Sequence, residues 1–216
     1  MADDSYSTLK SLDALSPRGL AGKREYVLEL ERRAHDGGLP PLVECLNDES
    51  GYLRDLASAA LTRLGAPAGP IVPLLASGLW YTRVSALRTL ARLRDASCAA
   101  PIAQLLADTN ESVRDEAVGA LLALARTADE VRVARAIHAA PDPARAWTVR
   151  EMVHLAPDVG RRLETLLKDK DLMLASEDEL LPRAPGARAA SEDGVAWDVL
   201  TNAVSADGQG LPLRPR

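Results

Sequence analysis

The amino-acid sequence predicts an all-α protein, a right-handed α-solenoid built from about four stacked helix pairs. Three observations lead to this fold class. Apolar residues make up 47% of the 216-residue chain, whereas aromatic residues make up 3% and Phe is absent, a composition that favours helices over sheets. An arginine recurs at positions 54, 83 and 114 with the same alanine and leucine spacing behind it. A proline stands 13 residues before each of these arginines, so the chain repeats a two-part unit.

Each repeat contains two predicted helices. Alanine and two leucines follow the arginine at offsets of 3, 7 and 10, which lie on one side of a 3.6-residue helix. The first helix is predicted from the prolines at 41, 70 and 101, each suited to a first helical turn and each followed by an apolar stripe. We expect both helices to have roughly 10 to 14 residues. Neither helix can cover its apolar stripe alone, so the units must stack. The aligned second helices are LRDLASAALTRL (53–64), TRVSALRTLARL (82–93) and VRDEAVGALLAL (113–124).

Residues 38–126 resemble short HEAT-like repeats, the form found in phycobilisome-lyase type proteins and in many bacterial adaptor proteins. The match rests on the helix-start prolines, the repeat arginines, the alanine and leucine ladder, and the turn acids Asp48 and Asp108. The middle repeat departs from the pattern, because Ser77 replaces the turn acid. The resemblance implies an armadillo-type fold but no single function, because this repeat serves many unrelated roles. The clearest matches are GLPPLVECLNDESGYLRDLASAALTRLG (38–65) and CAAPIAQLLADTNESVRDEAVGALLALA (98–125).

The segments that flank the clear repeats are more degenerate. A glycine pair ends the predicted capping helix, and the tail is rich in Pro, Ala and Gly. Within the tail, an amphipathic helix over 195–204 either caps the last repeat in cis or docks into a partner. The predicted segments are a polar N-terminal segment (1–20), a capping helix (21–37), a HEAT-like solenoid (38–175) with clear repeats (38–126) and degenerate ones (127–175), and a mostly disordered tail (182–216).

The register of the fourth repeat stays open. A first helix over 129–140 and a second helix over 144–156 are predicted. Arg145 keeps the 31-residue step of the preceding arginines. Arg150 instead stands three residues after Trp147, which is the spacing between tryptophan and arginine in the middle repeat.

Charge and cysteine usage argue against several classes of protein. The net charge of −5 argues against attraction of the whole chain to phosphate backbones or anionic lipid. Cys45 and Cys98 lie in apolar helical patterns, so we expect buried thiols rather than a disulfide framework or a metal site. The chain begins with an acidic, polar stretch, and no apolar run approaches the ~18 residues of a membrane span. We therefore expect a cytoplasmic protein with no membrane segment.

Catalysis finds little support in the sequence. His35 precedes Asp36, but adjacent residues on a helix rarely face each other, and His138 and His154 sit on different predicted helices. The His-Glu pairs of HEAT-fold metal-dependent hydroxylases are absent, and no glycine-rich loop joins a strand to a helix. The sequence predicts a non-enzymatic protein without a cofactor or a metal ion.

Nucleic-acid binding is not the main prediction either. Residues 38–126 contain 8 Arg, no Lys and 9 acidic residues. Proteins that track a phosphate backbone need several unopposed cations on one face.

Protein recognition therefore becomes the main functional prediction. Residues one, five and eight positions after each repeat arginine should face away from the core, with small residues at the middle of that face and Val84 and Leu122 at its rim. The small residues either form a trough for a docked peptide or let neighbouring repeats approach. Trp80 and Tyr81 are predicted to lie in an inter-helix turn, where they anchor an interface or Trp80 folds back as a local lid. The candidate binding residues are Tyr52, Asp55, Trp80, Tyr81, Arg83, Val84, Arg88, Leu122 and Trp147.

The repeat arginines should each find an acceptor in the preceding turn, because the helix dipole disfavours a cation in the first turn. Asp108 is the expected acceptor for Arg114, and Asp48 has the same place before Arg54. Arg83 has only Ser77 there, so we expect Arg83 to be the repeat arginine most available to a partner.

We predict a scaffold or adaptor that uses the solenoid surface to bind a protein or peptide; the sequence does not indicate its oligomeric state. One alternative, implied by the resemblance, is an accessory subunit of a lyase or modifying enzyme similar to bilin-attachment HEAT proteins. Another is an immunity or inhibitor protein with an acidic interface, for which the cluster Glu177-Asp178-Glu179 is a candidate. A nucleic-acid-binding HEAT-like protein is the last alternative.

Overall fold

The computed structural model describes residues 19–126 and 129–174, and within these residues every regular element is a helix. The described residues belong to one compact unit that ends at Leu174. The predictions for the tail, including the helix over 195–204 and the acidic cluster at 177–179, lie outside the described residues. The helices are α1 (Gly19–Arg32), α2 (Leu39–Glu44), α3 (Gly51–Arg63), α4 (Trp80–Leu93), α5 (Ala99–Gln104), α6 (Glu111–Ala125), α7 (Glu130–His138), α8 (Asp142–Leu155), α9 (Pro157–Lys168) and α10 (Lys170–Leu174).

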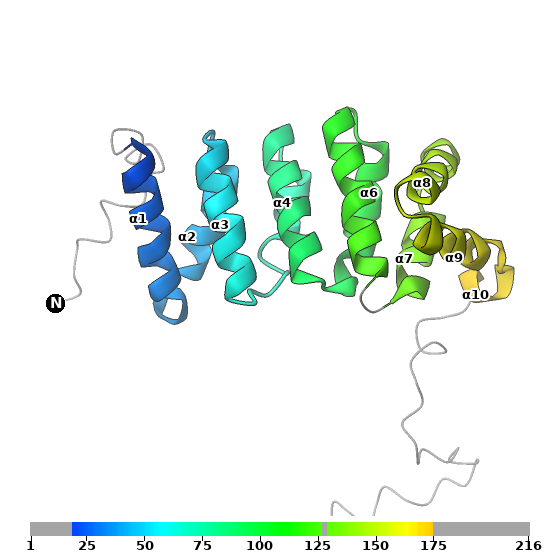
Figure 1. Cartoon of the computed structure of the whole chain (residues 1–216), viewed down its shortest axis with the longest axis horizontal. Helices are drawn as coiled ribbons and strands as arrows, with labels where there is room; N and C mark the ends of the chain where they lie inside the picture. The colour runs from blue at the N-terminus through cyan, green and yellow to red at the C-terminus, as the bar shows by residue number, and fades with distance from the viewer. Residues whose placement is uncertain (1–18, 127–128, 175–216) are drawn as a thin grey trace, which may run out of the picture. The chain divides into compact units, whose positions relative to one another are not determined.

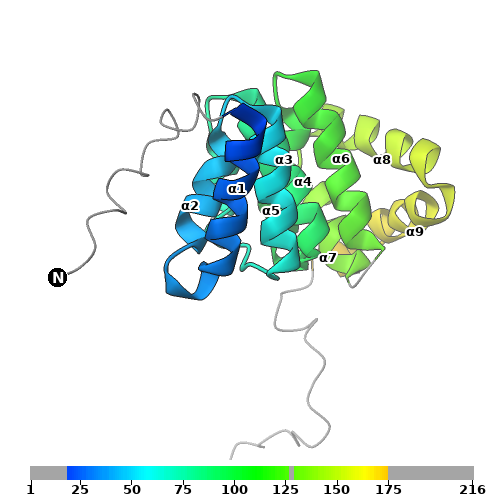
Figure 2. The ribbon, with the colours of Figure 1, turned by 60° about the vertical axis from the view of Figure 1, so that its left-hand side comes forward.

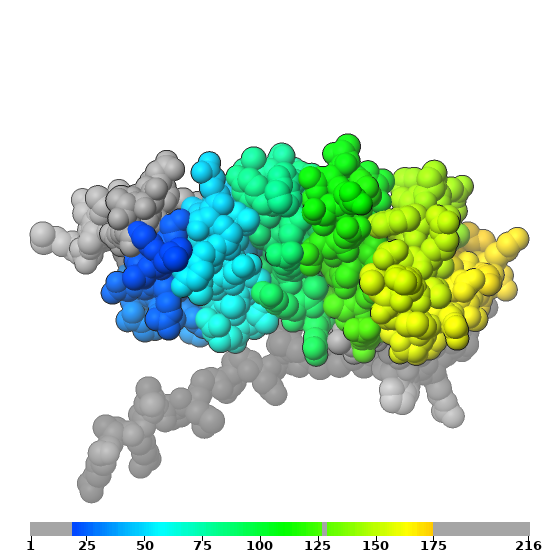
Figure 3. Space-filling model, turned by 45° about the horizontal axis from the view of Figure 1, so that its top comes forward, coloured from blue at the N-terminus to red at the C-terminus, as the bar shows by residue number. Residues whose placement is uncertain are grey.

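The helices form an all-α solenoid, as the sequence predicts. Helices α1, α3, α4 and α6 lie side by side in one row, and α8 and α9 follow at its end (Figure 1). The shorter α2, α5 and α7 pack against this row and form a second layer (Figure 2). In the space-filling view the successive units form adjacent bands across one face (Figure 3). No helix in the described part of the chain is long and apolar enough to cross a membrane.

The first helix of each repeat is shorter than the expected 10 to 14 residues. Helices α2 and α5 have 6 residues each and continue as short 3-10 helices, Cys45–Asn47 and Leu105–Ala107. In the middle repeat the first helix is only a five-residue 3-10 helix, Val72–Ala76. Pro73 explains this difference, because it has no N–H to donate and its ring clashes with the carbonyl four residues earlier. Pro70, expected in a first helical turn, lies in the turn before this element.

The alanine and leucine ladder forms the core, which confirms the repeat alignment. The alanines three residues after the arginines and the leucines seven residues after them have no exposed surface. Each fully buried leucine contributes about 2 kcal/mol relative to an exposed one. The residues concerned are Ala57, Ala86 and Ala117 and Leu61, Leu90 and Leu121.

Both cysteines are free thiols buried in this core, as the sequence predicts. Burial raises the pKa of Cys45 to about 12, with a further contribution from the nearby carboxylates Asp48 and Glu44. Burial also raises the pKa of Cys98.

We expect neither thiol to react with an aromatic disulfide reagent at about pH 8 while the protein is folded, because the thiolate is the reactive form and reagent cannot reach it. Absorbance of the released chromophore should rise only after denaturant is added, and it should then correspond to two thiols per chain. A Cys98→Ser variant, which should release one equivalent, serves as the control. Rapid labelling of the native protein would contradict the burial of these side chains.

Candidate protein-binding site

The turn before each second helix has the same hydrogen-bond pattern in the three clear repeats. The repeat arginine donates its Nη1 to the main-chain carbonyl six residues earlier, at 2.7 Å for Arg54, 2.7 Å for Arg83 and 2.9 Å for Arg114. Asp48 and Asp108 are thus the acceptor residues, as expected, but through their carbonyl oxygens. Their carboxylates instead accept the N–H two residues further on, at 2.7 and 2.8 Å.

Arg83 is held by a second partner, so the prediction that it is the most available arginine is wrong. Its Nη2 donates to Oδ1 of Asp108 at 2.9 Å, and its Nε lies 2.9 Å from Oδ2, without hydrogen-bond alignment. The side chains of Arg83 and Asp108 are only 12% and 9% exposed. Arg83 therefore joins its own turn to the turn of the next repeat and presents little surface to a partner.

Arg54 has no such acid in the next repeat, because Ser77 stands there. Its Nε donates to the hydroxyl of Ser85 at 3.0 Å, and its guanidinium lies 4.7 Å from the ring centroid of Tyr81. Tyr81 is therefore a half-buried structural neighbour of Arg54 and not a free anchor.

The predicted turn aromatics lie in helices, which corrects the sequence-based placement. Trp80 and Tyr81 are the first two residues of α4, and Tyr52 is the second residue of α3. Trp80 packs edge-on against Tyr81 with ring centroids 6.0 Å apart, yet it remains 48% exposed, so it does not act as a closed lid.

Three large side chains are exposed at the starts of these two helices. Leu79 is 42% exposed and Tyr52 is 39% exposed, in addition to Trp80. Helices α3 and α4 pack side by side, and the contact between Arg54 and Tyr81 shows that their first turns are adjacent. We call Tyr52, Leu79 and Trp80 the aromatic edge.

The face of the second helices is less open than expected. Asp55 and Arg88 are exposed, but Val84 and Leu122 are buried, at 7% and 6% exposure, which corrects their predicted outward position. Val84 is buried because adjacent second helices pack flank to flank, as the contact between α4 and α6 shows.

Side-chain contacts cross the same row. The hydroxyls of Thr89 and Ser58 share a hydrogen bond of 2.8 Å, and Arg92 donates to the same Ser58 hydroxyl at 3.0 Å. Arg88 pairs with Glu116 at 2.8 Å. Short side chains between the helices thus let neighbouring repeats approach, which favours the packing role over a peptide trough.

The structure resolves the register of the fourth repeat. Arg145 donates its Nη1 to the carbonyl of His138 at 2.8 Å, the counterpart of the bond made by the other repeat arginines. Met152 occupies the leucine position seven residues later and is 1% exposed. Arg150 is exposed, so Arg145 is the repeat arginine.

Trp147 lines a cavity of about 470 Å³ between the start of α6 and the start of α8. The tryptophan is half-buried and packs against the core. Arg114 and Glu111 also line this cavity. No sequence pattern indicates the cavity, because its walls come from two repeats.

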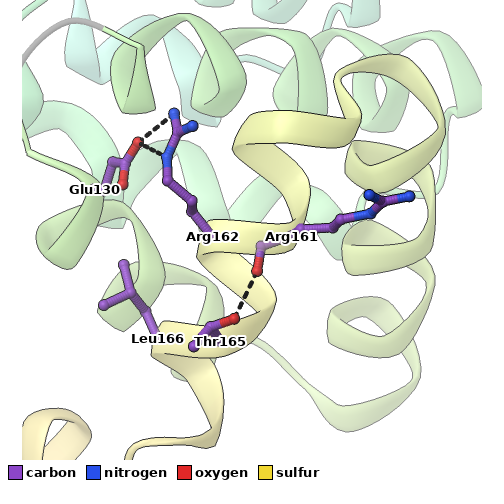
Figure 4. Close-up of a pocket in the computed structure, with 5 residues that line it drawn as sticks. All are labelled: Glu130, Arg161, Arg162, Thr165 and Leu166. Atoms are coloured by element: carbon purple, nitrogen blue, oxygen red, sulfur yellow. Dashed lines mark hydrogen bonds and ion pairs between the residues drawn. The ribbon is translucent and has the colours of Figure 1, made fainter.

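A second cavity, of about 380 Å³, lies beside α9. Arg162 in its wall is bound to Glu130 at 2.7 Å, and Arg161 points away from this pair (Figure 4). The two arginines therefore do not converge on one anion. Among residues 19–126 and 129–174, no group of three metal-ligating side chains could hold a metal ion.

The arrangement of stacked helix pairs defines the chain as a helical-repeat solenoid. Comparison with known proteins does not identify its family. No protein-family model matches the sequence, and no curated protein matches it. Among solved structures, an engineered protein from a structural genomics consortium has a TM-score of 0.41 and 17% identity, over 74% of this chain and 91% of that one. A designed armadillo repeat protein in complex with the peptide (KR)4 has a TM-score of 0.39 and 16% identity, over 74% and 97%. A further designed armadillo repeat protein has a TM-score of 0.39 and 16% identity, over 76% and 95%.

Proposed function

We propose that the protein is a non-enzymatic scaffold that binds a partner protein through the aromatic edge. The observation that carries this proposal is the exposure of Tyr52, Leu79 and Trp80 at the adjacent starts of α3 and α4. Exposed apolar clusters of this kind mark interaction surfaces, and tryptophan and tyrosine are enriched among residues that dominate binding energy. The resemblance of residues 38–126 to the HEAT-like repeats of bacterial adaptors supports the same role.

The middle repeat differs from its neighbours in a way that suits a binding surface. Where the other clear repeats have a turn acid, this repeat has Ser77, and Arg54 turns instead to Tyr81. Tyr81 in turn packs against the edge of Trp80. Trp80 is thus held in one orientation before a partner arrives, which lowers the entropic cost of binding.

Leu79→Ser combined with Trp80→Ala should abolish capture of the partner with little loss of stability. The protein would be used as bait in a cell extract, and bound proteins would be identified by mass spectrometry. For a purified partner we expect the Kd to rise at least about 30-fold, because a central tryptophan contributes about 2 kcal/mol or more.

Leu155→Ala is the matched control, because Leu155 is 54% exposed but lies at the end of α8. This variant should keep the partner. The proposal fails if the double variant binds the same protein as the wild type, or if the bait recovers only nucleic acid.

A further inference from the structure

Arg114 lacks the carboxylate partner that Arg83 has. Its Nη1 donates to the carbonyls of Asp108 and Thr109, at 2.9 and 3.3 Å. Arg83 makes the equivalent Nη1 bond, and in addition its Nη2 and Nε face the carboxylate of Asp108. Among the residues that the structure describes, no carboxylate forms an ion pair with Arg114, so its Nε and Nη2 edge is available.

The reason lies in the turn of the fourth repeat. Asp108 stands six residues before Arg114 and accepts its Nη1 bond. In the fourth repeat the carbonyl that Arg145 bonds belongs to His138, seven residues earlier, and neither His138 nor Ala139 carries a carboxylate. The nearest acid in that turn, Asp142, pairs with Arg145 instead. Arg114 therefore has no carboxylate from the turn of the next repeat, whereas Arg83 has Asp108.

A cavity of about 470 Å³ lies beside Arg114, between the start of α6 and the start of α8. Its walls are largely apolar, with Leu106 on one side and Pro141, Pro143 and Trp147 on the other. This volume falls in the range of ordinary ligand sites, and a mostly apolar wall with one convergent charged group is their usual composition.

We propose that this cavity, the Arg114 cavity, binds an acidic peptide segment of a partner protein. An Asp or Glu carboxylate of the segment pairs with the Nε and Nη2 edge of Arg114, the edge that faces the Asp108 carboxylate in Arg83. An adjacent apolar side chain packs against Trp147 and the prolines. Charge complementarity identifies the occupant, because a guanidinium edge matches the geometry of a carboxylate. The inference rests on the proposed protein-binding function and specifies the chemistry of the partner.

Glu111 is the one lining residue that opposes this ligand. It lies at the first position of α6 and is exposed, so water and salt screen its charge. Its carboxylate should slightly weaken binding of an acidic peptide. Removing this negative charge should therefore tighten binding, which provides a second test of the proposal.

The test titrates the full-length, ¹⁵N-labelled protein with the capped peptide Ac-Ala-Leu-Asp-Leu-Ala-NH₂ and with its Asn counterpart. The Trp147 indole N–H resonance, assigned with a Trp147→Phe variant, reports on the cavity. We expect the Asp peptide to shift this resonance with a Kd of roughly 1 mM, and the Asn peptide to bind about tenfold more weakly or worse. Equal binding of the two peptides, or no shift with either, would overturn the proposal.

Variants separate the roles of the two charges. Arg114→Gln should weaken the Asp peptide about tenfold, whereas Arg63→Gln, which changes an exposed arginine paired with Glu31, should leave its Kd unchanged. Arg114 also bonds two carbonyls, so its removal costs stability. Glu111→Gln leaves those bonds intact and should tighten the Asp peptide two- to threefold without affecting the Asn peptide, an effect of roughly 0.5 kcal/mol. A Glu111→Gln variant with weakened binding would contradict the charge assignment.

An acidic residue of this chain, rather than of a partner, could be the group that occupies the Arg114 cavity, and a further variant tests for that occupant. Asp198 lies in the segment over 195–204 that the sequence predicts to cap the last repeat or to bind a partner. A shift of the Trp147 resonance on Asp198→Asn, without added peptide, would assign the cavity to this chain and would overturn the partner proposal. The peptide titration involves no residue of the aromatic edge. Failure of the cavity and failure of the proposed function are therefore distinguishable.

Discussion

Replacing Asp108 with Ala should lower the free energy of unfolding by about 3–5 kcal/mol. The substitution leaves the Arg83 guanidinium, which is 12% exposed, without its carboxylate, and an uncompensated buried charge costs several kcal/mol. It also removes the acceptor for the N–H of Asn110, which contributes about 1 kcal/mol. Urea denaturation followed by circular dichroism would measure the loss.

Asp48→Ala is the matched control for this variant. Asp48 accepts the N–H of Ser50 in the same kind of turn, but its only ion-pair neighbour among the described residues is Lys23, at 3.7 Å. We expect a loss of about 1–2 kcal/mol, and the difference between the two variants isolates the contact with Arg83. Equal losses at the two positions would show that this buried pair adds nothing to stability.

Gly160→Ala should destabilise the protein by about 2–3 kcal/mol, because α9 crosses α8 at this glycine with no space for a side chain. A Cβ at Gly160 would lie 2.5 Å from the main-chain nitrogen of Val153 and 2.7 Å from the carbonyl carbon of Met152. These neighbours are backbone atoms that cannot rotate away. The two helices would have to separate, and the midpoint of urea denaturation should fall.

Gly119→Ala provides the opposite result. Gly119 lies within α6, and a Cβ there would meet nothing within 4 Å. Alanine should stabilise the helix by about 0.5–1 kcal/mol, since it loses less backbone entropy on folding. If both substitutions destabilised the protein by similar amounts, the close approach of α8 and α9 would not be the cause.

Helix identity and the core could be predicted from local spacing. The alanine and leucine offsets placed Ala57, Leu61 and their counterparts on a buried face, because helical periodicity depends only on neighbouring residues. The same period located the arginines and their turns. The predicted length of the first helices was wrong in all three clear repeats. The difference is largest in the middle repeat, because Pro73 prevents the preceding turn from joining a regular helix despite its apolar pattern.

The candidate site was predicted only in part. Trp80 and Tyr52 are exposed at helix starts, close to their expected position. Val84 and Leu122 were placed on the wrong side, because spacing along one helix does not reveal where the next helix packs.

Local sequence therefore decided which residues form helices, which face is apolar and which arginine begins each repeat, because these properties arise within one or two turns of chain. Tertiary structure decided which repeat arginine pairs with a carboxylate. Arg83 meets Asp108, 25 residues away, whereas Arg114 faces a turn whose only nearby acid belongs to Arg145. Such pairings depend on how the repeats stack. Stacking sets the distances between side chains of neighbouring repeats, and the spacing of residues within one repeat does not predict those distances.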